Sequence, residues 1–444
     1  MCNGSLMDKL ISFSLPLMIS SILQLMFNAV DIIVVGQFTG SHALAAVGST
    51  TAIINVFTNL FIGISLGANV LAARFYASGK SKEMSETVHT SITFALISGI
   101  AMAFIGFLFS KGALELMGTP DNVISQSTLY MQIYFLGMPF FMLYNYGAAI
   151  LRAVGDTKRP LIYLVISGFA NVVLNLILVI LFHMGVAGVA IGTVASQLIS
   201  CILVLRCLYS TDSIYQLRFS KLKIQRFYLI QICQVGIPAG IQSTVINLSN
   251  ALLQSSVNSF GSTAMAGYTA ANNILGFLYS SVNAVTQSCM SFTSQNYGAR
   301  KTKRMDRVLL NCLVLSFAFS FTLGCGAYFF GDKILRLYTV EPDVIQCGME
   351  ILSYTTITYF CCGIMDLIPG ALRGMGHSGV PMILSIIGTV GTRIVWIFVF
   401  FPQHRSLEFL FISYPASWIL TIIMQVICYY FVRKKVHRRI LAAQ

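Results

Sequence analysis

Asp31 has the clearest chemical potential in this 444-residue sequence, because it stands alone in a long apolar stretch. Residues 10–73 are 64 positions in which Asp31 is the single Asp, Glu, Lys or Arg. An ionisable group at membrane depth is costly and is by default a functional hypothesis. Counting from Lys9 and from Gly36 and Gly40 puts Asp31 about 8–13 Å below the far membrane surface. We therefore expect Asp31 to bind a coupling cation; the alternative is a lipid-facing or purely structural acid.

Three oxygen-bearing side chains are expected at a depth similar to that of Asp31. Asn171 and Asn175 are spaced i, i+4 and share one face of a helix, and Thr193 lies about 12 Å from the end of the next apolar stretch. Carboxylate, amide and hydroxyl oxygens are hard donors suited to a proton or a sodium ion. These four residues form the predicted proton-coupling site, or a sodium site, and no other metal site is expected. Alternatively, the Asn and Thr side chains only join helices by hydrogen bonds.

A second pair of ionisable groups, Asp366 and Arg393, lies in apolar stretches of the second half. An intramembrane Arg should face a cavity or a partner. We expect Asp366 and Arg393 to interact across neighbouring helices. This pair is either a fixed salt bridge or a second coupling site.

Further polar residues are expected to line a cavity. One stripe in the seventh apolar stretch is spaced i, i+4, i+7 and i+11, as on one face of a helix. Alternatively, this stripe only packs helices together. The predicted lining comprises Asn28, Ser243, Asn247, Asn250 and Gln254. Pro16 precedes Asp31 in the same stretch, and a Pro inside a helix permits a bend.

Membrane-spanning helices must position these groups, because the chain is 56% hydrophobic and only 10% charged. Soluble domains carry roughly 25% charged residues, so a soluble enzyme, a disordered chain and a nucleic-acid-binding domain are excluded. A spanning helix needs about 20 apolar residues. Twelve stretches predict an all-α polytopic membrane protein: 10–36, 46–73, 88–110, 128–151, 160–182, 185–205, 228–258, 264–295, 308–330, 346–372, 380–401 and 407–432.

The Lys and Arg residues predict the orientation of these spans. Loops on one side hold 23 of the 28, the opposite loops hold 4, and Arg393 lies inside a span. Cytoplasmic loops carry the excess of Lys and Arg, so we expect both termini in the cytoplasm of a plasma (inner) membrane. These loops also account for the net charge of +13, and no nucleic-acid partner is expected.

The two halves of the sequence repeat at an offset of about 221 residues. LRAVGDTKRP at 151–160 matches LRGMGHSGVP at 372–381, and Gly155 and Pro160 suit a helix end and the next helix start. Six spans followed by six in the same orientation predict two bundles around a central cavity, with alternating access. The predicted domains are an N-lobe at 1–209, a cytoplasmic linker at 210–227 and a C-lobe with a basic tail at 228–444.

Catalytic motifs are missing from the sequence. It contains no H-E-x-x-H, no G-x-S-x-G and no metal-type Cys/His cluster, so neither an enzyme nor a bound cofactor is expected. A channel is the other competing class, and it would pass ion current without exchanging a substrate. The architecture favours transport over both.

Five segments resemble the MATE (multidrug and toxic compound extrusion) family in order and spacing: NAVDIIVVG at 28–36, ALAAVG at 43–48, LRAVGDTKRP at 151–160, GVAIGTVASQ at 188–197 and FTSQNYGARK at 292–301. The resemblance implies a secondary antiporter that expels amphipathic, often cationic, organic compounds in exchange for protons or sodium. It implies two six-helix lobes forming a V-shaped cleft, and a first span that can bend near Pro16, so that protonation of Asp31 is read out as a change of shape. The alternative is a static kink at Pro16. We expect a monomer in the lipid bilayer.

The closest resemblance is to the DinF-like branch of this family, with one departure. That branch pairs an acid in the first span with an Asn and, four residues later, an acid in the fifth; here the second acid is replaced by Asn175. One titratable group where the branch has two favours a proton at Asp31 over a two-acid sodium site. The alternative function is a lipid-linked oligosaccharide flippase of the same superfamily. Its headgroup cavity should be markedly cationic, whereas only Arg393 is both basic and intramembrane.

Overall fold

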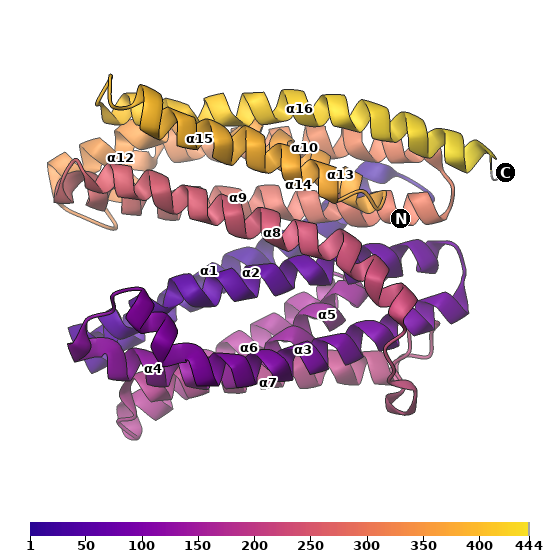
Figure 1. Cartoon of the computed structure of the whole chain (residues 1–444), viewed down its shortest axis with the longest axis horizontal. Coiled ribbons are helices and arrows are strands. Elements are labelled where there is room, and N and C mark those ends of the chain that lie inside the picture. Colours follow the sequence, from indigo (N-terminus) through magenta and orange to yellow (C-terminus); the bar gives the residue numbers. More distant parts are fainter. Residues whose placement is uncertain (443–444) are drawn as a thin grey trace. The chain divides into compact units, whose positions relative to one another are not determined.

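The computed structural model describes residues 1–442, and its regular elements are all helices. They form two compact units. We call Ile19–Gly240 the N-unit, and Met1–Met18 with the described residues from Ile241 onward the C-unit. In Figure 1 the N-unit runs from indigo to magenta along the sequence colours, and most of the C-unit runs from magenta to yellow.

Each unit is a bundle of long helices, and two helices contribute to both units: α1 (Leu6–Thr39) and α8 (Arg226–Asn258). The N-unit also contains α2 (Ser41–Ala77), α3 (Ser81–Leu116), α4 (Asp121–Leu136), α5 (Met138–Val154), α6 (Lys158–Leu176), the π-helix η1 (Ile177–Leu181), α7 (Gly185–Ser210) and the 3₁₀ turn η2 (Phe219–Lys221). The C-unit also contains α9 (Ser262–Gly298), α10 (Thr302–Phe329), α11 (Gly331–Leu335), α12 (Pro342–Thr355), α13 (Tyr359–Gly374), α14 (Gly379–Ser385), the π-helix η3 (Ile386–Gly391), α15 (Thr392–Val395), the π-helix η4 (Trp396–Phe400) and α16 (Leu407–Ala442).

The two compact units have other bounds than the predicted domains, which stay a prediction. The units separate inside α1 and α8 rather than at a linker between residues 209 and 228, because each of these helices is continuous through the boundary. The predicted linker also belongs to the N-unit, since Leu217 is fully buried and Tyr215 packs against the same core. The last two residues of the predicted C-lobe, 443 and 444, lie outside the described residues.

The number of spans that qualify by length and apolar composition is smaller than the twelve predicted. Nine helices of the described chain qualify, and up to eleven if each bent pair is one span. The bent pairs are α4 with α5, at 45°, and α12 with α13, at 51°. They occupy the predicted spans 128–151 and 346–372. The span predicted at 264–295 is the helix α9, whose buried face carries many Ser, Thr, Asn and Gln side chains. That α9 crosses the membrane stays a prediction.

Small residues let the helices of the N-unit approach closely. A Cβ at Gly67 of α2 would collide with the Ile232 carbonyl oxygen of α8, and a Cβ at Gly236 would lie 2.5 Å from Ile64 Cα. Such small-residue contacts are typical of helix packing in membranes, where burial of apolar surface does not drive association. They fix the first part of α8 against α2.

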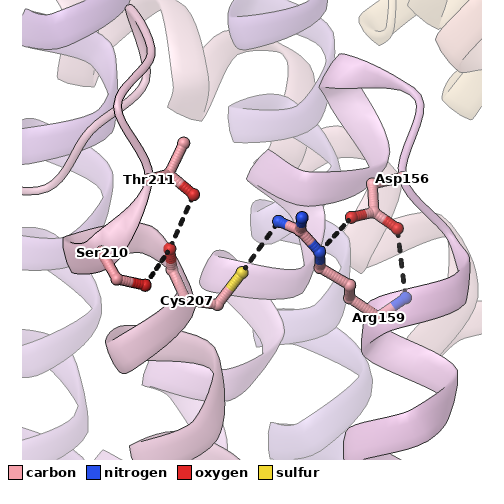
Figure 2. Close-up of polar contacts among 5 residues, drawn as sticks. All are labelled: Asp156, Arg159, Cys207, Ser210 and Thr211. Atoms are coloured by element: carbon pink, nitrogen blue, oxygen red, sulfur yellow. Dashed lines mark hydrogen bonds and ion pairs between the residues drawn. The ribbon is translucent and has the colours of Figure 1, made fainter.

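The loop between α5 and α6 takes the local form that the sequence predicts. Gly155 ends α5 with a φ of 102°, and Pro160 lies in the first turn of α6. Figure 2 shows the Arg159 backbone N–H donating to Asp156 Oδ1 (3.1 Å) and the guanidinium donating to Cys207 Sγ of α7 (3.4 Å). These contacts hold the loop and the start of α6 against α7, so a structural role is enough to explain the loop residues.

Candidate functional site

Asp31 of α1 is hydrogen-bonded to Asn175 of α6 within the N-unit. Asn175 Nδ2 donates to Asp31 Oδ1 at 2.5 Å, across 144 residues of sequence. Asn175 is fully buried, whereas Asp31 keeps partial exposure. A hydrogen bond to a carboxylate is charge-assisted and strong. The structure therefore brings together Asp31 and Asn175, two of the four residues predicted for the coupling site.

Asn171 lies one helical turn before Asn175 and completes an amide pair. Asn175 Nδ2 also approaches Asn171 Oδ1 at 3.4 Å, and Asn171 is 4% exposed. Asn175 Oδ1 is buried and has no hydrogen-bond partner in the described part of the chain. An unsatisfied buried acceptor costs about 1–3 kcal/mol. This oxygen is thus available to a bound cation or, after rotation of the amide, to the O–H of a protonated Asp31.

Thr193 does not join this hydrogen-bond network. Its Oγ1 donates to Val189 O of the same helix, α7, at 2.9 Å. Gly192, its neighbour, was not recognised from the sequence: a Cβ there would collide with Asn175 Oδ1. The glycine therefore makes room for the Asn175 amide. The GVAIGTVASQ segment contains both residues, but spacing alone does not reveal which of them faces α6.

Two tyrosines of α4 also lie near Asp31 and were not predicted. Tyr130 and Tyr134 are stacked with ring centroids 6.3 Å apart, and both interact electrostatically with Asp31. Their i, i+4 spacing placed them on one helix face, but no sequence signal connects that face to Asp31. The carboxyl group thus lies among an amide and phenol groups rather than among other acids.

A local change in helix type follows the amide pair. The α-helix α6 ends at Leu176 and continues as the π-helix η1 (Ile177–Leu181). Such π segments are rare and are frequent at functional sites. Pro16, in contrast, is buried inside a continuous α-helical run of α1. The bend predicted at Pro16 stays a prediction.

The C-unit contains a different polar network, centred on Arg393 of α15. Arg393 Nη1 donates to Asn250 Oδ1 of α8 at 2.7 Å, and its guanidinium carbon lies 4.6 Å from the Tyr414 ring centroid. The Tyr414 hydroxyl contacts that of Tyr268 at 3.1 Å. Arg393 is 3% exposed. This network holds a guanidinium where the N-unit site holds a carboxylate.

Arg393 makes no ion pair with Asp366 among the described residues, contrary to the pairing expected from the sequence. Asp366 instead interacts with Tyr279 and with Arg373. Arg373 donates to Gln242 Oε1 at 2.7 Å. The two groups have different partners because Asn250 and an aromatic ring, rather than an acid, lie beside Arg393.

The residues predicted to line a cavity differ in exposure. Asn28, Ser243 and Asn247 are exposed, Gln254 is half-buried, and Asn250 is bound to Arg393. The described residues hold no group of three or more His, Cys, Asp or Glu side chains that could bind a metal ion. The role of the first four residues in lining a cavity stays a prediction.

Comparison with known proteins identifies the family. The sequence model of the MatE family matches residues 16–177 and 238–399. "Probable multidrug resistance protein YoeA" of Bacillus subtilis is 29% identical over 95% of this chain and 93% of its own. "Multidrug export protein MepA" of Staphylococcus aureus is 23% identical over 84% and 83%.

Solved structures agree with the fold. A crystal structure of MATE in the bent conformation has a TM-score of 0.89 at 19% identity, over 99% of this chain and 97% of that one. A Pyrococcus furiosus transporter of the MOP superfamily, described as having a binding pocket of reverse polarity, has a TM-score of 0.89 at 19% identity, over 98% and 96%. The chain belongs to the MatE family and is a multi-pass membrane transporter, not an enzyme.

Proposed function

We propose that this protein is a secondary active multidrug efflux antiporter, with Asp31 as its coupling carboxylate. It exports amphipathic and cationic organic compounds in exchange for protons, in preference to sodium. Relatives that cover most of the chain are described as multidrug resistance or export proteins. The observation that carries the proposal is the hydrogen bond between Asp31 and Asn175, because it joins a lone carboxyl group to a buried amide.

In the proposed mechanism, protonation of Asp31 changes which atoms of Asp31 and Asn175 form their hydrogen bond. Asn175 Nδ2 donates to Asp31 Oδ1, and this arrangement suits an ionised carboxylate. Protonated Asp31 is itself a donor and matches the unsatisfied Asn175 Oδ1 after the amide rotates. The two protonation states therefore favour different arrangements of α1 and α6, and a ligand that prefers one arrangement is coupled to the proton.

The choice of a proton over sodium rests on the composition of the site. It offers one carboxylate, and the atom that Asn175 turns toward that carboxylate is the Nδ2 donor rather than an oxygen ligand. A hard cation without water needs several oxygen ligands. By its motifs we assign the chain to the DinF-like branch, and Asn175 is its one departure, because that branch has a second acid at this position.

The proposed orientation follows from the basic loops. Both termini lie in the cytoplasm of a plasma (inner) membrane, because Lys and Arg are concentrated in the loops on that side. In this orientation the protein takes substrates from the cytoplasmic side or the bilayer and releases them outside. We propose that it works as a monomer.

Transport of lipid-linked oligosaccharide is the second candidate, and one observation favours it. Arg393 and Arg373 are both buried in the C-unit, and the Nε of each has no hydrogen-bond partner among the described residues. Buried guanidinium groups suit an anionic headgroup. The single pair of arginines and the acid Asp366 beside Arg373 make this candidate weaker.

Transport of ethidium into liposomes tests the proposal. Proton and sodium gradients are imposed separately on wild type, Asp31→Asn and the control Asp121→Asn, which makes the same change at an exposed position. Drive by protons alone, lost in Asp31→Asn and kept in Asp121→Asn, is the expected result. Drive by sodium, or unchanged transport in Asp31→Asn, contradicts the coupling role, and no transport under either gradient favours the flippase.

A further inference from the structure

A cavity of about 520 Å³ lies in the N-unit, away from Asp31, between the first turns of α3 and the segment that leads into α8. Its lining includes Lys82 of α3 and both Lys221 and Lys223 of the connecting segment. None of these lysines belongs to the proposed coupling site at Asp31.

The wall of the cavity is held in place by buried hydrogen bonds. His89 is 4% exposed; its Nε2 accepts the Arg218 backbone N–H at 3.0 Å, and its Nδ1 faces Ser85 O at 2.6 Å. Because Nε2 accepts, Nδ1 carries the proton and donates to that carbonyl. The Gln225 backbone N–H donates to Thr90 Oγ1 at 3.2 Å. The connecting segment is thus fixed on α3, and the cavity is formed without a ligand.

The charges in the cavity are mostly positive. Three lysines line it with one acid, Glu86, which hydrogen-bonds Tyr228. None of these lysines takes part in an ion pair within residues 1–442. The nearby Glu83 instead pairs with Lys80 at 3.5 Å. The cavity therefore holds an excess of ammonium groups that lack a carboxylate partner.

The start of α3 adds hydrogen-bond donors to this charge. The helix is 36 residues long and no side chain caps its first turn in the described structure, so its first N–H groups and dipole favour an anion. Ser81 and Ser85 line the same cavity with hydroxyl groups. Lysines, hydroxyls and backbone N–H groups together are the donors that bind a phosphate group.

Apolar residues that lie within two positions of the lining residues in the sequence favour a lipid over a free ion. Phe219 is 55% exposed and stacks on Tyr209, with ring centroids 5.6 Å apart. Phe227, two residues after Gln225, is 64% exposed. Aromatic residues at the level of lipid headgroups are typical of membrane interfaces, and basic pockets there bind anionic headgroups. A free phosphate ion has no apolar part to contact these rings, whereas a lipid has acyl chains.

We propose that this cavity binds the phosphodiester headgroup of an anionic glycerophospholipid. Lys82, Lys221 and Lys223 contact the phosphate oxygens, and the acyl chains lie along Phe219 and Phe227. The bound lipid ties the connecting segment to the first turns of α3 and α8. It therefore stabilises the N-unit in an anionic membrane, independently of the transported substrate and of the coupling ion.

Binding of a fluorescent phosphatidylglycerol to the full-length protein in neutral detergent tests this proposal. Phosphatidylcholine and inorganic phosphate compete in separate arms. The variant Lys82→Gln/Lys221→Gln/Lys223→Gln is compared with Lys303→Gln/Lys434→Gln/Lys435→Gln, a control that removes three exposed lysines of the C-unit. Lys221→Gln alone serves if the triple variant does not fold.

We expect phosphatidylglycerol to bind wild type and to raise its melting temperature, with phosphatidylcholine much weaker. Each cavity lysine removed should weaken binding on the order of fivefold, while the control triple keeps wild-type affinity. Equal losses in both triple variants would mean non-specific attraction and overturn the proposal. Competition by inorganic phosphate as strong as by the lipid would identify a free-anion site and overturn the lipid assignment.

Discussion

The two units carry opposite charges at polar sites formed by corresponding helices, α1 and α6 in one unit and α8 and α15 in the other. The matched segments of the family begin at residues 16 and 238, which pairs Asn28 with Asn250 and Asp31 with Leu253. The match of 151–160 to 372–381 pairs Asn171 with Thr392, the residue before Arg393. In the N-unit, Asn175 of the amide pair donates a hydrogen bond to the carboxylate of Asp31. In the C-unit, the Arg393 guanidinium donates to Asn250. The position of Asp31 is taken by Leu253, which is 1% exposed.

This difference shows how a duplicated scaffold can separate two tasks. The N-unit keeps a lone acid with partial exposure, which a proton can reach. The C-unit replaces that acid with a packed leucine and fills the neighbouring position with a guanidinium, which remains charged at any physiological pH. Proton coupling in this protein is therefore expected to be asymmetric between the halves.

The largest expected effect separates the two intramembrane acids. Asp31→Asn removes the titratable group beside Asn175 and should lower proton-driven export about 100-fold, whereas Asp366→Asn should lower it less than about fivefold. Asp366 has its own partners, Tyr279 and Arg373, and we expect its role to be structural. Initial export rates in liposomes at a fixed pH gradient measure both. Equal losses in the two variants would refute the asymmetry.

A second prediction concerns the guanidinium network of the C-unit. Asn250→Leu removes the acceptor of a charged hydrogen bond from the buried Arg393 and should lower the free energy of unfolding by about 1.5–3 kcal/mol. Arg393→Met/Asn250→Leu replaces both polar groups and should recover part of this loss. Denaturant unfolding in detergent measures it, with the exposed neighbour Asn247→Leu as control. If the double variant is less stable than Asn250→Leu, Arg393 has another important partner.

A third prediction tests the space that Gly192 gives to Asn175. A Cβ there collides with Asn175 Oδ1, and overpacking typically costs 1–3 kcal/mol. Gly192→Ala should therefore reduce export about 10-fold by displacing the amide from Asp31. Gly48→Ala is the matched control, because a Cβ at Gly48 of α2 meets no atom within 4 Å. Full activity of Gly192→Ala would show that the amide position is unimportant.

The sequence predicted those features that local pattern determines. The length of the apolar stretches predicted the helices, and Gly155 and Pro160 predicted the loop between α5 and α6. The i, i+4 spacing predicted that Asn171 and Asn175 share a helix face. The isolation of Asp31 in an apolar stretch identified the residue that Asn175 contacts. Each of these depends on residues near one another in the chain.

Features that depend on packing between helices were not predictable in the same way. The partner of Arg393 is Asn250 rather than Asp366, because the rotation of α8 and α15 decides which side chain faces the guanidinium. Gly192 matters only through its contact with α6.

The smallest expected effect concerns one ion pair in each unit, Arg433 with Asp306 and Arg159 with Asp156. Arg433 of the C-unit donates to both oxygens of Asp306 at 2.7 Å, whereas Arg159 Nε of the N-unit lies 3.3 Å from Asp156 Oδ2. Both arginine side chains are partly exposed, at 42% and 51%. Exposed pairs contribute about 0–1 kcal/mol, and bidentate geometry favours the upper end.

Arg433→Gln should therefore lower the free energy of unfolding by about 1 kcal/mol and Arg159→Gln by less than about 0.5 kcal/mol. High salt should narrow the difference, because it screens exposed charges. Unfolding in denaturant at low and high salt measures both variants. A larger loss for Arg159→Gln would mean that its contact with Cys207, rather than its ion pair, stabilises the N-unit. The two units would then differ in how they secure their helix ends as well as in the charge that they bury.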